Sequence, residues 1–423
     1  MLAACRPVRQ HGSPGRRYRQ RVTSAISADQ LRALRLRRQL LTGPRAGSVV
    51  AAAAHLGGVQ AQAAPPARLA IRARAGGVTA ADVDRACGTS RDVTRTWAMR
   101  GTLHMLATRD VRWMTSLLGP VSAARGRRRR AQLGLDDTLC ERALAALPVI
   151  LAGSPPLTRA ELVSRLATEG IRISLGTQQP PHLLGYAASC GLICRGPDRP
   201  GRARRPGPPD RDGGGDAGSE GDAEGAGAGR DGEPTYVLLD EWAPDAPALG
   251  TDEALAELAR RYLGGYGPAG RGDFAAWSGL PAADAARALD LLAGDLVAVS
   301  ADGARLFALA GDSLEAPGDL PPRLLSHFDP LLLGYRDRAL LLDPRYARRI
   351  QAGGGFVQPA VLIGGRVAGT WRLVRAAGRT RRALVTVEPF TALPAGSADG
   401  LAAEAADIGR FLGVATTLGT VQT

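Results

Sequence analysis

The hydrophobic and polar positions along the chain switch repeatedly between helical spacing and short strand-like runs. In the middle of the chain, Thr158 and Glu161 have the spacing of a capping box, which predicts a helix through Thr168 that ends at Gly170. A second helix is expected at 179–190, and strand-like runs are expected at 192–194 and 236–239. Helix, turn, helix, strand, loop and strand is the element order of a winged helix-turn-helix unit.

The same order occurs twice more. Helical patterns at 252–263, 272–280 and 281–292 precede a predicted hairpin, in which 296–299 pairs with 305–307 across Ala301, Asp302 and Gly303. A looser copy lies near the N-terminus, where Ser27 and Gln30 form a capping box, residues 48–56 are helical, Thr79 and Asp82 begin another helix, and 102–106 is a strand. Three copies in one chain are a more specific signal than one.

We therefore expect a mainly α protein with small β hairpins (α+β), made of three tandem winged helix-turn-helix units and a small β-containing C-terminal part. Strand-like runs at 359–363, 366–371 and 383–387 and a helix near 399–412 predict that last part. The predicted boundaries are 27–135 for the first unit, which carries the catalytic motif, 136–245 for the second, 246–312 for the third, and 313–423 for the C-terminal region.

Two segments have no pattern that could build a core. Residues 196–234 hold only Gly, Pro, Ala, Ser, Arg, Asp and Glu, so we expect a disordered insert in the second wing. Residues 1–26 are rich in arginine without hydrophobic periodicity. They are expected to be a disordered basic arm or to result from a start codon assigned too early.

The composition narrows the chemistry. All 54 basic residues are arginine, and lysine is absent. This excludes a Walker-type phosphate loop, a pyridoxal-phosphate enzyme and a lysine-based lyase. The five cysteines are scattered, which fits a reducing compartment, and no apolar run is long enough to span a membrane. We expect no cofactor, no metal site and no membrane partner, and a cytoplasmic, nucleoid-associated monomer.

The net charge of +14 favours a nucleic-acid partner, because guanidinium groups neutralise phosphates. The arginines are unevenly spread. Residues 1–45 hold eleven of them against one acid, Asp29, and Arg125 is followed by a basic run at 127–130. Codon bias or a solvated basic face is the alternative explanation.

Gln60 and Gln62 are the candidate catalytic residues. They lie between a helix and Pro65-Pro66, so the segment should be extended, and side chains two residues apart then point the same way. Two neutral amides can hold a water molecule, although a glutamine is not a strong base. Such a pair suits a reaction whose leaving group is already good, whereas polar residues that cap loop backbone are the structural alternative.

Four separated motifs resemble the AlkZ/YcaQ family of winged-helix DNA glycosylases. They are Gly58-Val59-Gln60-Ala61-Gln62, the stretch from Arg95 to His104, the segment from Tyr262 to Leu280, and Phe328-Asp329-Pro330 with Tyr335-Arg336-Asp337-Arg338. The resemblance implies a concave DNA-binding surface and a catalytic glutamine motif at Gln60 and Gln62. The AlkZ branch of the family has glutamine at the second position of this motif, and the YcaQ branch has aspartate. Gln62 therefore makes the chain resemble the AlkZ branch, whose activity is the removal of bulky alkylated purines and the unhooking of interstrand crosslinks.

The function expected from this resemblance is hydrolysis of the N-glycosidic bond of cationic N7- or N3-alkylated purines in double-stranded DNA. Without lysine, the enzyme should be monofunctional, with no lyase activity. The alternative is a non-catalytic winged-helix DNA-binding protein, such as a transcriptional regulator. The candidate DNA contacts are polar or basic residues near these motifs and in the C-terminal hairpin: Arg100, Thr102, His104, Tyr335, Arg336, Arg338, Arg372 and Arg379.

Overall fold

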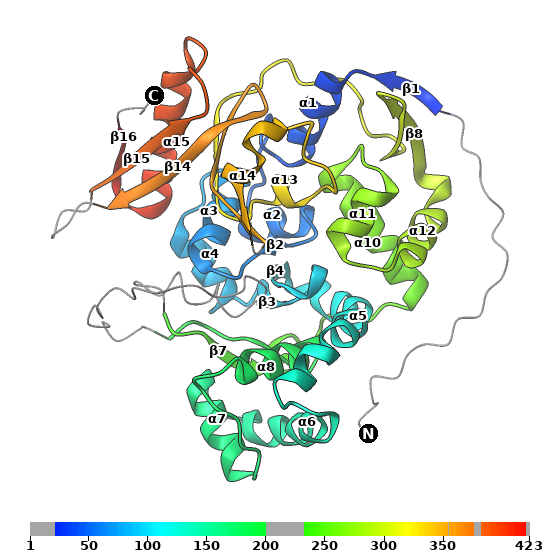
Figure 1. Cartoon of the computed structure of the whole chain (residues 1–423), viewed down its shortest axis with the longest axis vertical. Helices are drawn as coiled ribbons and strands as arrows, with labels where there is room; N and C mark the ends of the chain where they lie inside the picture. The colour runs from blue at the N-terminus through cyan, green and yellow to red at the C-terminus, as the bar shows by residue number, and fades with distance from the viewer. Residues whose placement is uncertain (1–21, 200–231, 354, 376–381, 420–423) are drawn as a thin grey trace.

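The computed structural model describes residues 22–199, 232–353, 355–375 and 382–419 (Figure 1). Its strands form sheets of six, five, three and two strands, with helices packed between and around them. None of the described helices combines the length and the apolar content needed to cross a bilayer.

The first predicted unit contains the expected helices and two further ones. The capping box of Ser27 and the helix start at Thr79 and Asp82 are confirmed, and Ser48 caps the helix that was predicted at 48–56. The elements are α1 (Ala28–Arg38), α2 (Val49–His55), β2 (Val59–Gln60), α3 (Ala64–Arg74), α4 (Ala80–Cys87), β3 (Val93–Trp97), β4 (Leu103–Ala107) and α5 (Val111–Gln132).

The prediction of a disordered arm at 1–26 is wrong for its last five residues. Residues Val22–Ile26 form strand β1, which pairs in parallel with β8 (Leu296–Ala301), more than 250 residues further along the chain. Helix α1 follows β1 and packs on α10 (Thr251–Tyr266), and Arg35 of α1 donates to the carbonyl of Pro268 at 3.0 Å. Residues 1–21 lie outside the described part of the chain.

The second unit confirms the helix-turn-helix and its hairpin. Gly170, at φ 72°, follows α7 as predicted. The elements are α6 (Asp137–Leu151), β5 (Leu157–Thr158), α7 (Arg159–Thr168), α8 (Gln179–Ser189), β6 (Ile193–Arg195), β7 (Thr235–Leu238) and the short α9 (Leu239–Trp242).

The predicted insert at 196–234 is too long at both ends, because residues 196–199 and 232–234 are structured. Arg95 binds the Asp198 carboxylate through both terminal nitrogens, at 2.6 and 2.8 Å, and Arg199 pairs with Glu161 at 2.7 Å. A bridge joins Arg199 to Glu233. Residues 200–231 of the predicted insert lie outside the described residues.

The first two wings form one sheet. The six strands run in the order β2-β4-β3-β6-β7-β5. Strands β3 and β6 are antiparallel neighbours, and Arg95 lies opposite Arg195 in their backbone register. Helix α5 continues from the first wing and packs against α8 of the second unit. The Gln60 strand is therefore an edge of a sheet that spans two units.

The third unit matches its prediction. The turn of its hairpin is Asp302-Gly303, where φ is 47° and 77°, as a two-residue hairpin turn requires. Its elements are α10, α11 (Arg271–Ser278), α12 (Ala282–Leu291), β8 and β9 (Ala304–Leu309).

The C-terminal region is a five-stranded sheet covered by helix α15 (Ser397–Leu412) (Figure 1). Three of its strands and α15 were predicted. The sheet strands are β10 (Arg323–Leu325), β13 (Ala360–Ile363), β14 (Arg366–Arg375), β15 (Arg382–Pro389) and β16 (Ala415–Leu418). Short elements lie between β10 and β13 in the chain: α13 (Pro330–Leu333), α14 (Ala347–Ile350), β11 (Gln351–Gly353) and β12 (Phe356–Val357).

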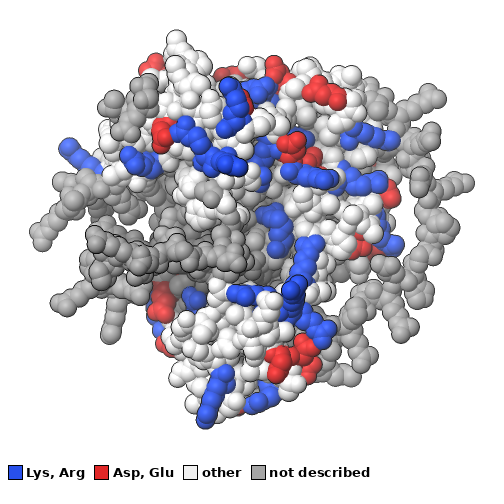
Figure 2. Space-filling model, viewed as in Figure 1, with Lys and Arg blue, Asp and Glu red and all other residues white. Residues whose placement is uncertain are grey.

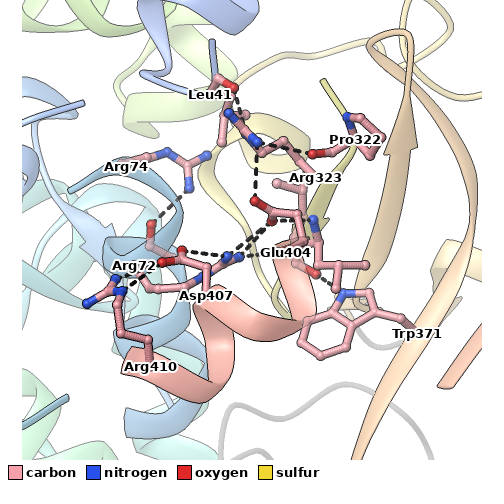
Figure 3. A network of polar contacts seen from close by, with 12 residues as sticks. Leu41, Arg72, Arg74, Pro322, Arg323, Trp371, Glu404, Asp407 and Arg410 are labelled. Carbon is pink, nitrogen blue, oxygen red and sulfur yellow. Dashed lines mark hydrogen bonds and ion pairs between the residues drawn. The ribbon is translucent and has the colours of Figure 1, made fainter. Parts of the chain in front are cut away.

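A buried ionic network attaches α3 to this region (Figure 3). Both terminal nitrogens of Arg72 lie 3.1 Å from a Glu404 oxygen on α15, and Arg72 also donates to the carbonyl of Leu324 at 2.9 Å. Arg323 binds the other Glu404 oxygen at 3.2 Å, and Asp407 binds Arg72 at 3.2 Å. Helix α3 begins two residues after Gln62, so the network fixes the segment that follows the glutamine motif.

Candidate active site

A tight glycine turn sets the direction of the glutamine motif. Gly57 and Gly58 follow α2 at φ 63° and 121°, and the chain then enters β2. A Cβ on Gly58 would lie 2.6 Å from the Leu106 side chain, so β2 approaches β4 more closely than any other residue would allow. Gln60 pairs directly with His104 of β4, and the Ala61 amide donates to the carbonyl of Leu103 at 2.7 Å.

The two glutamine side chains meet, as their spacing predicted. The Nε2 of Gln60 donates to the Oε1 of Gln62, and both side chains are half-buried. Gln62 precedes α3, whose first turn holds Pro65 and Pro66, because proline is tolerated there without losing a hydrogen bond. The pair therefore lies between a sheet edge and a helix start, with part of its surface accessible.

Arg100 joins this pair. It lies at the tip of the β3–β4 hairpin in the left-handed region, with φ 58° and ψ 11°. One terminal nitrogen donates to the Oε1 of Gln60 at 2.9 Å, and the other donates to the carbonyl of Trp277 in α11 at 2.6 Å. Burial and then the charge of Arg338 lower the pKa of Arg100. Among the described residues, no carboxylate forms an ion pair with it.

His104 lies beside Gln60 but is fully enclosed. Its side chain is 2% exposed, and its Nδ1 lies 2.8 Å from the carbonyl of Thr102. Burial and the charge of Arg100 lower the pKa of His104 to about 3, so the ring is neutral at physiological pH. The Thr102 hydroxyl donates to the carbonyl of Met99 at 3.1 Å, within the same hairpin.

The prediction that Tyr335 contacts the DNA backbone is wrong. Tyr335 is 3% exposed, its hydroxyl donates to the carbonyl of Tyr266 at 2.9 Å, and Arg35 lies over its ring at 3.9 Å. It belongs to a buried aromatic cluster with four other rings. These are Tyr262, Tyr266, Phe274 and Trp277. Most of the aromatic motif residues thus build the support behind Arg100.

Of the other predicted DNA contacts, Arg336 lies beside the start of α11 and Arg338 lies near Arg100. Arg336 is exposed, and its backbone amide donates to Asp273, which also caps α11. Arg338 is half-buried, its Nε donates to the carbonyl of Leu332, and it is near enough to lower the pKa of Arg100. Arg100 and Arg338 therefore place positive charge at and near the glutamine pair.

The C-terminal candidates lie on another element. Arg372 is exposed on β14 and lines a cavity of about 320 Å³ together with Arg349, Thr386 and Glu388. Arg379 lies outside the described residues.

The basic run of α5 is only partly available to a ligand. Arg130 is 7% exposed and lies 3.9 Å from the centre of the Tyr186 ring. Arg127 pairs with Asp137, and Arg129 donates to Gln178 at 2.7 Å. Arg125 and Arg128 are exposed. Figure 2 shows some of the basic side chains of this face where the part that carries α6 to α8 meets the rest.

The family motif from Tyr262 to Leu280 contains the two positions that bring α11 to the site, but the sequence did not predict their contact with Arg100. Trp277 supplies the carbonyl that Arg100 binds, and Gly279 ends α11 at φ 76°. A Cβ on Gly279 would lie 2.9 Å from the Cα of Arg100. The local pattern, a glycine after a short helix, does not predict this contact, because the partner residue is nearly 180 positions away.

Comparisons with known proteins agree with this arrangement. The family described as DNA glycosylase AlkZ-like matches residues 53–411. An interstrand DNA cross-link repair glycosylase of Streptomyces sahachiroi is 28% identical over 358 residues, which are 82% of this chain and 87% of that protein. The solved structure of Streptomyces sahachiroi DNA glycosylase AlkZ has a TM-score of 0.73 and 24% identity, over 93% of this chain and 100% of that one. At that identity, the structural likeness shows the fold.

Proposed function

The chain belongs to the family of AlkZ-like DNA glycosylases, and we propose that its own reaction is hydrolysis of the N-glycosidic bond of N7- or N3-alkylated purines in double-stranded DNA. The observation that carries this proposal is the hydrogen-bonded pair of neutral amides, Gln60 and Gln62, half-buried beside Arg100 and near Arg338. We assign both glutamines to the binding and orientation of the attacking water.

The chemistry of such substrates matches this site. Alkylation at N7 of guanine or N3 of adenine makes the base cationic, so the glycosidic bond is weakened before the enzyme acts. No acid is then needed to protonate the leaving group. The carbonyl oxygens of Gln60 and Gln62 can accept hydrogen bonds from a water molecule and direct its lone pair at the anomeric carbon. His104 is neutral and enclosed, which is consistent with a reaction that needs no strong acid or base.

Crosslinked DNA is a substrate that the same site could accept. The relative from Streptomyces sahachiroi is an interstrand DNA cross-link repair glycosylase. In an N7–N7 crosslink each purine is cationic in the same way as a monoadduct. Because Gln60 and Gln62 keep exposed surface, we propose that a purine carrying a bulky adduct can approach them.

The product should be an intact abasic site. A lyase step through a Schiff base uses an amine, usually of lysine, and the chain contains no lysine. We therefore propose a monofunctional enzyme that works as a monomer, because three winged-helix units in one chain can supply a DNA surface that shorter regulators build by dimerisation.

Product analysis tests this function. Duplexes with a single N7-methylguanine, or with one nitrogen-mustard crosslink, would be incubated with the full chain. We expect release of the free base and strand cleavage only after alkali. Cleavage without alkali would contradict the monofunctional assignment. Tight binding without base release from either duplex would overturn the proposed reaction and favour the non-catalytic DNA-binding protein.

A further inference from the structure

Arg100 makes two contacts that join three elements. Its guanidinium bridges Gln60 on β2 and the carbonyl of Trp277 near the end of α11, while its backbone belongs to the β3–β4 hairpin. Trp277 lies in the last turn of α11, where a backbone carbonyl has no hydrogen-bond partner within its own helix. Arg100 supplies that partner. The contact with Gln60 has no such structural need.

That second contact decides which way the Gln60 amide faces. A guanidinium has only donors, so the atom of Gln60 that faces it must be the carbonyl oxygen. The Nε2 of Gln60 is then directed at Gln62, and the atom of Gln62 that it meets must be an oxygen as well. Without Arg100, either amide could turn by 180° and present donors where the water needs acceptors.

We propose that Arg100 is a positioning residue that fixes the amide orientation of Gln60, and through it that of Gln62, for the attacking water. This inference rests on the proposed function. It also assigns Arg100 a different role from the DNA contact expected from the sequence, because the nitrogens that a phosphate would engage most readily are directed at protein oxygens.

The backbone around Arg100 supports a fixed orientation. Its φ of 58° is uncommon for a residue with a side chain, and such strain persists where the surroundings enforce it. Gly279 lies directly against the Cα of Arg100, and the amide of Gly101 donates to the carbonyl of Ala98 at 2.9 Å. The side chain therefore begins from a rigid point.

Two substitutions separate orientation from charge. Arg100→Lys keeps the positive charge but loses the planar fork that spans both oxygens. Arg100→Gly removes the side chain and adopts a positive φ without strain, so the hairpin can keep its shape. Arg345→Ala is the matched control, because it removes an exposed arginine whose side chain, among the described residues, contacts Asp343 and the neighbouring ring of Tyr346.

The readouts are the single-turnover excision rate at saturating enzyme, the Kd for the same duplex at several salt concentrations, and the thermal midpoint. We expect Arg100→Lys and Arg100→Gly each to lower the rate about 10- to 100-fold, the range that a misplaced reacting group costs. The Kd and its salt dependence should remain those of wild type and of Arg345→Ala.

A double-mutant cycle with Gln60→Ala gives the decisive result. If Arg100 acts through Gln60, then adding Arg100→Lys or Arg100→Gly to Gln60→Ala should lower the rate less than about threefold further. The inference would be overturned if the rate losses of the two substitutions multiplied in the combined variant. It would also be overturned if the Arg100 variants bound DNA more weakly, with a smaller salt slope and an unchanged rate, which would identify a phosphate contact. Excision absent from the wild type would instead contradict the proposed function itself.

Discussion

Gln60 and Gln62 carry no formal charge, and this restricts the substrates that their site can serve. An amide can orient water but cannot take its proton in advance, so the bond must already be weak. Arg100 and Arg338 add positive charge near the two glutamines. When a cationic base is bound there, DNA phosphates would have to balance this charge. At the residue scale, the proposed site would act by orientation rather than by acid–base catalysis.

The pKa of His104 gives a stability prediction. Its folded pKa is about 3, whereas the unfolded value is near 6.5, so the unfolded state binds the proton first as the pH falls. The free energy of unfolding should therefore fall as the pH drops from 6.5 toward 3, by at most about 1.4 kcal/mol per pH unit from this residue.

Urea denaturation of wild type and His104→Gln between pH 7.5 and 4.5 measures this. The variant should lose stability less steeply below pH 6.5. It should not become independent of pH, because burial also lowers the pKa values of His55, His182 and His327. Parallel curves for the two proteins would show that His104 is protonated normally in the folded state.

At the scale of elements, capping-box signals located the starts of α1, α4 and α7 correctly, because these signals are local. The capping side chains of Ser27, Thr79 and Thr158 accept hydrogen bonds from amides three positions away. Strand β1 was missed since its partner β8 is remote, and α5 was missed because its arginine run hides the apolar face that packs on α8. The meeting of Gln60 and Gln62 was predictable from spacing, whereas the contact of Arg100 with α11 was not.

The attachment of α3 to the C-terminal region depends on ion pairs that are buried away from solvent. Arg74 on α3 and Asp329 are both 0% exposed and lie 2.6 Å apart, and Arg74 also donates to Gln39 at 3.0 Å. Removing one member of such a pair leaves the other charge buried without compensation. Asp329→Ala should therefore lower the free energy of unfolding by about 3–5 kcal/mol.

Guanidinium chloride denaturation tests this, with Asp290→Ala as the matched control. Asp290 pairs with Arg271 at the surface, and such exposed pairs contribute less than about 1 kcal/mol. Equal midpoints for the two variants would mean that the Arg74–Asp329 pair is not what holds these elements together.

At the scale of the whole molecule, the first two wings share one sheet, and helix α3 of the first unit packs on β10 and α15 of the C-terminal region. The merging of the first two wings into a six-stranded sheet was not predictable, because each wing is a complete hairpin by itself. The family resemblance gave the order of the units, but it could not show that most aromatic motif residues lie in the core.

Salt dependence tests which arginines meet DNA. If Arg336 and Arg338 each contact a phosphate, Arg336→Ala and Arg338→Ala should weaken binding to undamaged duplex, and each should reduce the slope of log K against log salt by about 0.9. Fluorescence anisotropy at four salt concentrations measures this, with Arg345→Ala as the control. A wild-type slope in both variants would place the DNA elsewhere.

The most direct test of the glutamine site is single-turnover excision of N7-alkylguanine by wild type and by Gln60→Ala/Gln62→Ala, with DNA binding followed in parallel. Our account predicts that excision disappears in the variant while the Kd for the duplex stays close to that of wild type. Excision that continues at the wild-type rate would contradict the assignment of the water site to this pair.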